Sequence, residues 1–414
     1  MGRHHATTSP PTEQPDPSQW ARRLVVGFLA VVAAATAVAI VMMWPDFSRQ
    51  PAVSAQFEQV AAHTRVQVDG TVTATRPGPC SHPAAGTIVD QVPADPPGAT
   101  DCTVAIVELT EGAHAGKNTL IVTTGGLGEP DLAEGQEISL YEAADANGQV
   151  TYSFADYQRD TVLIVWGIIV TAAIVAVGGM RGLRSLVGLT VTLLAVFGYL
   201  VPALLRGGDP LRLSLVVGSA VLFFVIYLVH GFSWKSTSAL SGTLLAMGLA
   251  ALAGRYAIDS SHLRGLGSED NLLIQIYLPE LTITGLMLCG FVIGALGGLN
   301  DVTVAQASTV NELAELDPTA SRWTLFARAM KVGQDHVASM VYTLVLSYTS
   351  AALPLLLVLS ISGRTLRSIL TSDIMATELL RSGVGAVGLA LSIPVTTVIA
   401  AYVTPRRREA TQRG

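Results

Sequence analysis

The chain has 414 residues, of which 14% are charged and 50% are hydrophobic, and its formal net charge at pH 7 is -6. Soluble domains carry about 25% charged residues, so this composition, with a mean hydropathy of +0.48, excludes an ordinary soluble protein. The mild net charge argues neither for nor against a nucleic-acid partner, and we expect none.

Eight apolar stretches follow one another along the chain. Each is long enough to cross a bilayer as a helix, because about 20 apolar residues span the hydrocarbon core and a helix satisfies its own backbone amides. They run from Leu24 to Trp44, Thr161 to Gly179, Leu186 to Leu204, Leu213 to Val229, Thr237 to Ala253, Leu281 to Leu299, Val337 to Leu359 and Val384 to Val403. The predicted fold class is therefore an all-α polytopic membrane protein with about eight transmembrane helices, embedded in the lipid bilayer.

The two chain ends predict the orientation. Residues 1–23 are rich in proline and are typical of a disordered tail, and residues 24–44 form an uncleaved signal anchor, because no A-x-A-like cleavage site follows Trp44 directly. Arg22 and Arg23 precede this span, and Arg406 begins a basic cluster in the C-terminal tail, residues 405–414. The positive-inside rule then places both termini in the cytoplasm of a bacterium, with a multi-pass protein in its cytoplasmic membrane. Seven other arginines would fall on the opposite side, so the bias is incomplete.

Residues 45–160 form the largest polar segment, which this topology places outside the cytoplasm. Val66, Val68, Val72 and Ala74 alternate with polar residues, as in a half-buried strand. Further strand candidates, separated by Gly, Pro and Asp clusters, are residues 103–109, 119–123, 137–141 and 150–154. About five strands indicate a small β-rich domain inserted after the first helix, either an OB-like barrel or a sandwich.

This segment holds two of the three cysteines, Cys80 and Cys102. Two thiols in an oxidising compartment most often form a disulfide, which we expect here. His82 and His114 raise a metal site as the alternative, although zinc-ligand spacings are absent. The third cysteine, Cys289, lies in a membrane span, where it reads as a small packing residue.

A glycine stripe and two polar residues mark the end of the sixth span. Gly290, Gly294 and Gly298 are four residues apart and share one helix face, which allows another helix to approach closely. Asn300 and Asp301 follow at the expected membrane edge. Asp301 is a natural N-cap for a helix from Val302 to Leu316.

Residues 300–336 are expected to form a cytoplasmic loop region. Asp317 and Pro318 repeat the helix-start signal. The stripe Trp323, Phe326, Ala327 and Met330 then indicates a short amphipathic helix, either lying in the membrane interface or packed on the cytoplasmic face of the core, which Gly333 ends.

The seventh span carries a polar stripe. Its members recur at steps of three and four residues: His336, Ser339, Thr343, Ser347 and Ser350. In lipid such groups need partners, so the stripe should face other helices or a wet cavity. It is either a solute pathway or a set of hydrogen bonds between helices.

On the pathway interpretation, four titratable residues lie at the cytoplasmic mouth: Asp301, Glu312, Asp335 and His336. Asp301 and His336 would gate entry, and His336 would add pH dependence near neutrality. The alternative is that these are ordinary loop charges and helix caps. Asp301→Asn separates the two, because Asn caps a helix about as well as Asp.

Enzyme signatures are scarce. The chain has no G-x-S-x-G elbow, H-E-x-x-H pair or G-x-x-x-x-G-K-[ST] phosphate loop. We therefore expect no enzymatic activity, no cofactor and no metal.

The stretch from Gly294 to Leu313 (GALGGLNDVTVAQASTVNEL) resembles the YibE/F-like family of bacterial membrane proteins, as does Val332 to His336 (VGQDH) with the polar span after it. The family layout is similar throughout: an N-terminal anchor, an outer β-rich segment, the entry Asp156 to Asp160, and a membrane core. The resemblance carries Asp301, Glu312 and Asp335 over as matching positions and implies a transport role. Where the family often has Arg before the last of these aspartates, this chain has Gln334.

Two function classes follow. The first is a permease or transporter of unknown substrate whose path runs along the seventh span. The second is a non-transporting envelope scaffold or assembly factor, in which the outer β domain binds an envelope protein or the chain forms a homo-oligomer.

Overall fold

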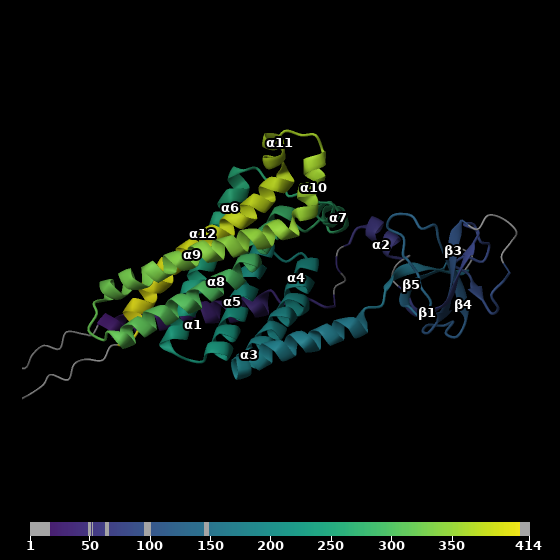
Figure 1. The fold of residues 1–414 in the computed structure, drawn as a ribbon. Helices are drawn as coiled ribbons and strands as arrows, with labels where there is room; N and C mark the ends of the chain where they lie inside the picture. Colours follow the sequence, from purple (N-terminus) through teal and green to yellow (C-terminus); the bar gives the residue numbers. More distant parts are fainter. Residues whose placement is uncertain are drawn as a thin grey trace, which may run out of the picture. The chain divides into compact units, whose positions relative to one another are not determined.

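The computed structural model describes residues 17–48, 51, 53–62, 66–94, 101–144 and 149–405 (Figure 1). The chain divides into two compact units. We call residues 53–173 the β unit, and residues 1–52 together with 174–414 the helical unit. Each is described by itself. The predicted tails at 1–16 and 406–414 lie outside the described residues.

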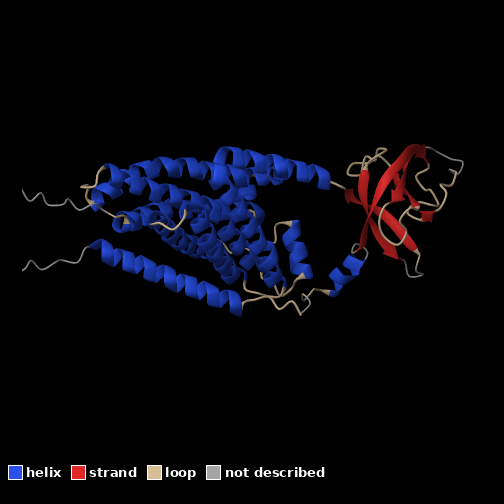
Figure 2. Ribbon diagram, turned by 90° about the horizontal axis from the view of Figure 1, so that it is seen from below, coloured by secondary structure: helices blue, strands red, loops and turns tan. Residues whose placement is uncertain are grey.

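The β unit contains one six-stranded antiparallel sheet, drawn red in Figure 2, in the order β2-β4-β3-β1-β5-β6. A short helix, α2 (Ala55–Ala62), precedes it. The strands are β1 (Val66–Gly78), β2 (Ile88–Val89), β3 (Cys102–Leu109), β4 (Asn118–Thr123), β5 (Glu137–Ala144) and β6 (Val150–Tyr157). All five longer strands were predicted within a few residues, except that β1 continues to Gly78; β2 and α2 were not predicted.

The sheet curls into a half-barrel because β1 serves two neighbours. Its first half pairs with β5 and its second half with β3, with an irregularity after Val72. Gly70 stands where both pairings overlap, and a Cβ there would lie 2.7 Å from Val107 Cγ1. The Tyr152 amide of β6 donates to the Gly86 carbonyl beside β2 at 2.7 Å, which brings the two ends of the sheet together.

Cys80 and Cys102 form the predicted disulfide, with their Cα atoms 5.0 Å apart. The histidines named in the metal alternative are engaged elsewhere. The buried His82 accepts the Ala84 amide at Nδ1, and His114 Nδ1 lies 3.0 Å from the Tyr152 hydroxyl. Among the described residues no cluster of three His, Cys, Asp or Glu side chains is placed to hold a metal ion.

The helical unit consists of long helices with short connections (Figure 1). In chain order they are α1 (Pro17–Met42), α3 (Asp160–Ala195), η1 (Val196–Leu200), α4 (Val201–Leu205), α5 (Pro210–His230), α6 (Trp234–Ser260), α7 (Glu269–Tyr277), α8 (Ile283–Leu316), α9 (Arg322–Ala351), α10 (Leu353–Ile361), α11 (Leu366–Leu370) and α12 (Asp373–Val403). The first part of α3, up to Ala173, belongs to the β unit. By length and composition, six helices of the described part of the chain could cross a membrane, or seven if α9 and α10, bent by 61°, count as one span.

One of the six is a 46-residue run, Asp160–Leu205, which contains two of the predicted spans. Gly179 interrupts it with φ 54° and ψ -137°, a backbone conformation that glycine adopts without a steric penalty. A Cβ on Gly182 would collide with the carbonyl oxygen of Ile174. Ile174 and Gly182 are eight residues apart, and a straight helix would separate them by about 12 Å. Because the two residues are in close contact instead, the chain must reverse between them, at Gly179. The reversal is compatible with eight spans, and that number stays a prediction.

The ends of several helices differ from the predicted ones. Residues 17–23 belong to α1 and are not part of a disordered tail. Most of residues 300–336 is helical, as α8 continues to Leu316 and α9 begins at Arg322, so the two long helices are joined by residues 317–321. That this region is cytoplasmic stays a prediction. The N-cap of α9 is Ser321, whose hydroxyl accepts the Thr324 amide at 3.0 Å, in place of Asp317.

Gly333 was expected to end a helix, and this is wrong, because it lies buried inside α9. A Cβ at this position would lie 2.6 Å from Ile393 Cγ2 of α12 and 3.1 Å from the Gln306 amide oxygen of α8. The glycine therefore lets α9 close against two neighbours. Tertiary packing of this kind outweighs the low helix propensity of glycine.

The core of the helical unit lies where α6, α8 and α12 meet, and α9 packs beside them (Figure 1). Phe291, Leu299, Leu389 and Ile393 are among its largest fully buried side chains. Apolar side chains on the outward surfaces of α1, α3 and α5 suit a hydrocarbon solvent, as expected of a membrane protein.

Candidate functional site

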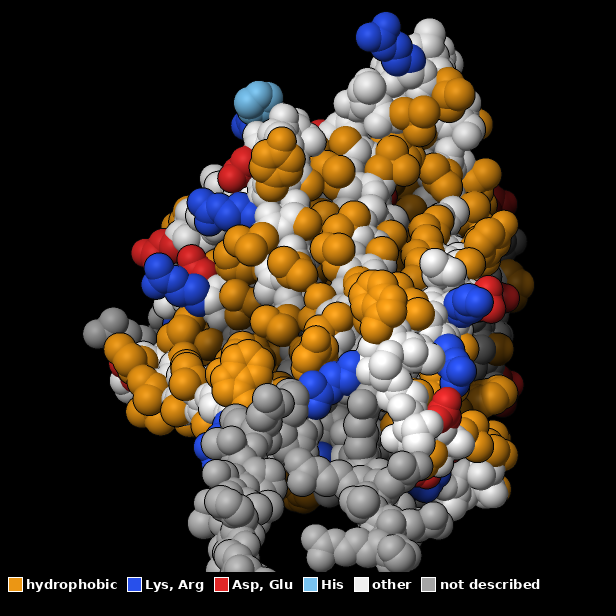
Figure 3. Space-filling model, turned by 90° about the vertical axis from the view of Figure 1, so that its left-hand side faces the viewer, with side chains coloured by type: hydrophobic (Ala, Val, Ile, Leu, Met, Phe, Trp, Pro, Cys, Tyr) orange, Lys and Arg blue, Asp and Glu red, His pale blue; other side chains and the backbone are white. Residues whose placement is uncertain are grey.

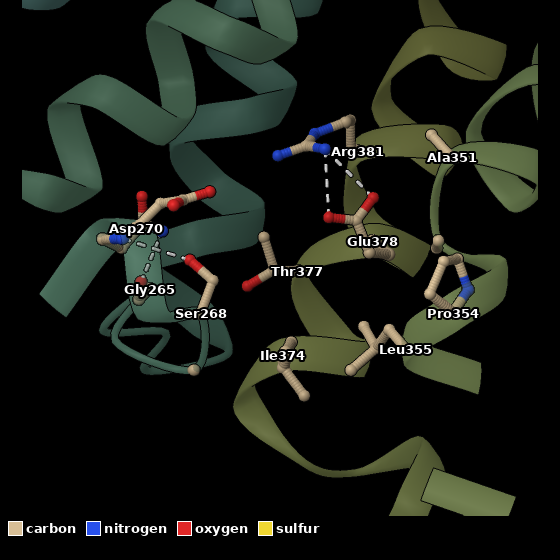
Figure 4. A pocket seen from close by; sticks show the side chains of 13 residues that line it. Gly265, Ser268, Asp270, Ala351, Pro354, Leu355, Ile374, Thr377, Glu378 and Arg381 are labelled. Atoms are coloured by element: carbon tan, nitrogen blue, oxygen red, sulfur yellow. Dashed lines mark hydrogen bonds and ion pairs between the residues drawn. The ribbon is translucent and has the colours of Figure 1, made fainter. Parts of the chain in front are cut away.

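A polar cleft of about 490 Å³ opens at the end of the helical unit where α6 leads into α7 and where α9 breaks into α10 (Figure 4). We call it the α10 cleft. One wall comes from Gly265 to Asn271, a second from Ala351 to Leu355, and a third from the first turns of α12, Ile374 to Arg381. Three segments far apart in the sequence thus form one site.

The break between α9 and α10 shapes the second wall. Pro354 lies at the start of α10, where its lack of an amide hydrogen costs nothing. In a continuous helix its ring would clash with the carbonyl four residues earlier, which kinks the chain. The 61° bend leaves backbone from both helices beside the cleft. Irregular backbone at membrane depth is tolerated where it lines such a cavity.

An ion pair occupies the third wall. Arg381 Nη1 lies 3.0 Å from the Glu378 carboxylate, one helical turn earlier on α12, and the two side chains are 31% and 23% exposed. Figure 4 shows the guanidinium above the carboxylate with Thr377 beside it. The guanidinium also lies 5.7 Å from the centre of the Phe291 ring on α8. A half-buried acid and base therefore face the cleft with their charges paired.

Hydrogen bonds hold the first wall in place. Ser268 caps α7 by accepting the Asn271 amide at 3.3 Å, and Asn271 Nδ2 donates to the Gly265 carbonyl at 2.7 Å. The Arg264 amide donates to Asp373 Oδ1 at 3.0 Å, which ties this loop to the start of α12. The Asp270 carboxylate lies on the wall opposite the ion pair (Figure 4).

Further along the bundle, buried polar side chains join the helices. Gln306 of α8 donates through Nε2 to the Ala329 carbonyl of α9 at 3.0 Å and to Thr397 Oγ1 of α12 at 2.7 Å. The hydroxyls of Thr243 on α6 and Thr303 on α8 lie 2.6 Å apart. Because these groups satisfy one another, they link the helices in this conformation.

Asp301 is placed differently from the prediction. It lies inside α8, so the expectation that it caps a helix starting at Val302 is wrong. Its side chain is exposed, and its electrostatic neighbour is His230 at the end of α5. Lys235 and Arg181 also act on His230. From the sequence, Asp301 was instead predicted to act together with His336.

The polar stripe of the seventh span lies on the outer surface of the helical unit. All of its members are exposed, as are the neighbouring acidic candidates: Glu312, Asp335, His336, Ser339, Thr343, Ser347 and Ser350. The expectation that the stripe faces other helices of the chain is wrong. Thr343 and Ser350 donate instead to carbonyls of their own helix, those of Ser339 and Ser347.

The three glycines of the α8 stripe differ in how closely a neighbouring helix approaches them. A Cβ on Gly294 would lie 2.6 Å from the Tyr348 hydroxyl of α9, and one on Gly298 would lie 3.4 Å from Leu389 Cδ2 of α12. Nothing lies within 4 Å of such an atom at Gly290. Close helix approach therefore accounts for two of the three glycines.

Sequence reasoning missed Glu378 and Arg381 as site residues. The signal was present, since an acid and a base stand three residues apart directly before the apolar run that begins at Val384. Ionisable residues at the start of a span are expensive to bury and mark functional sites more often than other positions do. The contribution of Gly265 to Asn271 was not readable, because only the fold brings that loop to α12.

The family comparison supports the resemblance noted in the sequence. The model of the YibE/F-like protein family matches residues 166–406, more than half of the chain. No curated protein and no solved structure matches the chain. The matched region holds α5 to α12, and thus every residue of the α10 cleft. The chain therefore belongs to the YibE/F-like family.

Proposed function

We propose that this membrane protein is a permease and not an enzyme, and that the α10 cleft is where a small polar solute enters its helical unit. The observation that carries the proposal is the half-buried Glu378–Arg381 pair beside a broken helix. Transporters commonly place their binding groups at such discontinuous helices. On the predicted topology the cleft opens outside the cytoplasm.

The pair suits a solute that itself carries charge. A solute with an anionic group can compete with Glu378 for the Arg381 guanidinium, which presents its donors in a planar fork. The released Glu378 carboxylate, with Asp270 across the cleft, can then accept a cationic group. A zwitterion or an ion pair would use both sites.

Asp301 and His230 supply a second polar group further along the path. Asp301 lies ten residues beyond Phe291 on α8, which is about 15 Å of helix rise. His230 is the electrostatic neighbour of Asp301, and Lys235 and Arg181 in turn act on His230. We propose that Asp301 acts at the opposite mouth, with His230 as its partner. The predicted role of the α9 stripe as a pathway stays a prediction.

Uptake into proteoliposomes tests the proposal, with glycine, sodium and phosphate as probes. Glu378→Gln and Arg381→Gln should each lower the initial rate of the transported probe at least about tenfold, because a charge-assisted hydrogen bond contributes roughly 1.5–3 kcal/mol. Arg255→Gln is the matched control, since it removes one partner of an exposed pair with Asp259 outside the cleft. Equal rates in all three variants would contradict a role for the cleft.

The second function class keeps one observation in its favour, which is that the β unit is compact by itself. As an envelope scaffold, the chain would bind its partner through this unit and transport nothing. Residues 53–160 on an affinity resin should then retain an envelope protein, and the full chain should show no uptake of any probe. The two experiments together separate a permease from a scaffold.

A further inference from the structure

A groove of about 550 Å³ runs between α1, α5 and the start of α6, away from the α10 cleft. We call it the α1 groove. Ala30 and Ala33 of α1 line it with small side chains, and Phe223 and Tyr227 of α5 form one side. The Tyr227 ring stacks on the Phe232 ring with centroids 4.4 Å apart, which extends the apolar wall.

The α1 groove opens toward the region that hydrocarbon should occupy. The three helices α1, α5 and α6 are each long and apolar enough to cross a membrane. Val26 on its rim is exposed, and the groove is lined mostly by apolar side chains. Its volume is within the range of small-molecule sites, about 300–1,000 Å³. A flexible alkyl chain is the occupant that such a groove suits.

One end of the α1 groove is basic. The guanidinium of Arg22 lies 5.0 Å from the centre of the Trp234 ring, and its Nε donates to the Val403 carbonyl at 2.9 Å. Arg23 and Lys235 adjoin these two residues in the sequence. Figure 3 views the corresponding end of the helical unit and shows Lys and Arg side chains, with some Asp and Glu among them, around an apolar surface.

Polar groups without a full charge accompany the basic residues at this end. The Ser233 and Ser236 hydroxyls lie 2.9 Å apart, and the Tyr227 hydroxyl lies 3.4 Å from Thr237 Oγ1. The groove thus changes along its length from apolar side chains to hydroxyls and then to cations. An amphiphile with an anionic head has the same order of chemistry.

We propose that the α1 groove binds one anionic phospholipid, with an acyl chain between α1 and α5 and the phosphate at the basic end, where Arg22 lies against Trp234 and Lys235 follows in the chain. Basic sites between membrane helices are a recurring way of holding such headgroups. The proposal does not depend on transport. Nor does it depend on which side of the membrane this end faces.

Thermal unfolding of the purified full chain in neutral detergent tests the proposal. Dioleoylphosphatidylglycerol should raise the Tm in a saturable way, and dioleoylphosphatidylcholine, with the same chains and no net charge, should not. Glycerol 1-phosphate, which has the phosphate without chains, should also leave the Tm unchanged. Equal shifts with both lipids would overturn the choice of an anionic head, and an equal shift with glycerol phosphate would overturn the role of the acyl chain.

Variants locate the site. Lys235→Gln should weaken the phosphatidylglycerol affinity about fivefold, because a basic side chain near a lipid surface contributes about 1 kcal/mol. Lys331→Gln, on α9, is the matched control and should not change it. Ala33→Trp fills the groove and should abolish the shift, whereas Ala34→Trp on the neighbouring surface of α1 should retain it. Unchanged affinity in Lys235→Gln, or a retained shift in Ala33→Trp, would overturn the assignment.

Discussion

At the scale of single residues, the site depends on two charges that stabilise each other. Glu378 and Arg381 are less than a third exposed, so each would be costly to leave unpaired. Surface pairs such as Arg255 and Asp259, whose nearest atoms are 3.7 Å apart, remain in contact with solvent. The strength of an ion pair between arginine and a carboxylate therefore depends on how far the pair is buried.

Arg381→Gln should lower the free energy of unfolding by about 1–2 kcal/mol, because Glu378 is left half-buried without its cation. Arg255→Gln should cost less than about 0.5 kcal/mol, since Asp259 stays hydrated. Thermal unfolding in detergent measures both. Equal losses in the two variants would show that burial of the α12 pair contributes little.

Asp317 ends α8 and helps to fix the connection to α9. Its pKa is held below the usual range by the Thr319 hydroxyl and by Arg328, whose Nη1 lies 3.1 Å from Oδ2. A carboxyl with a lowered pKa in the folded state stabilises the fold above its unfolded pKa, and this stabilisation is lost as pH falls through the folded value.

Hydrogen exchange of residues 313–325 should therefore accelerate as pH falls below about 4, after correction for the intrinsic exchange rate. Asp317→Asn should show the faster exchange already at pH 6 and less change on acidification. Asp335→Asn, an exposed site on α9, is the control and should behave as the unmodified protein does. An unchanged exchange profile in Asp317→Asn would show that this carboxyl does not cause the pH dependence.

At the scale of elements, glycines decide how closely helices approach. Gly333 and Gly290 look alike in the sequence, since each lies within a helical pattern. Of these two, Gly333 alone faces another helix closely enough to exclude a Cβ. The continuous α9 depends on that contact, which local propensity does not encode.

Gly333→Ala should destabilise the chain by about 1–3 kcal/mol through overpacking against Ile393 and Gln306. Gly290→Ala should be neutral or stabilising by up to about 1 kcal/mol, because Ala favours a helix and meets no neighbour. Chemical denaturation in mixed micelles would measure both. A loss in Gly290→Ala as large as that in Gly333→Ala would revive the predicted packing role of the whole α8 stripe.

At the scale of the whole molecule, the chain joins a β unit, which contains an internal disulfide, to a bundle of apolar helices. Disulfides persist in oxidising compartments, so the Cys80–Cys102 bond supports the predicted placement of the β unit outside the cytoplasm. The reversal at Gly179 supports the predicted pair of spans within Asp160–Leu205.

Reporter fusions test this topology. With eight spans and both termini cytoplasmic, a reporter near Gly112 should be active outside and a C-terminal reporter inside. A reporter at Ser233, between α5 and α6, should also read inside. A C-terminal reporter found outside would remove the orientation, and with it the assignment of the α10 cleft to the outer face.

The sequence by itself determined the membrane class, the apolar runs, five strands and the disulfide pair, because composition and periodicity report directly on solvent and secondary structure. It also determined the family, through the stretch that contains Asp301. Only the tertiary structure decided that Asp301 and Gly333 are interior helix positions. It also decided that the α9 stripe faces outward, and that Glu378 and Arg381 share a cleft with Gly265 to Asn271. The reason is that caps and breaks are weak local preferences, which contacts between distant helices outweigh.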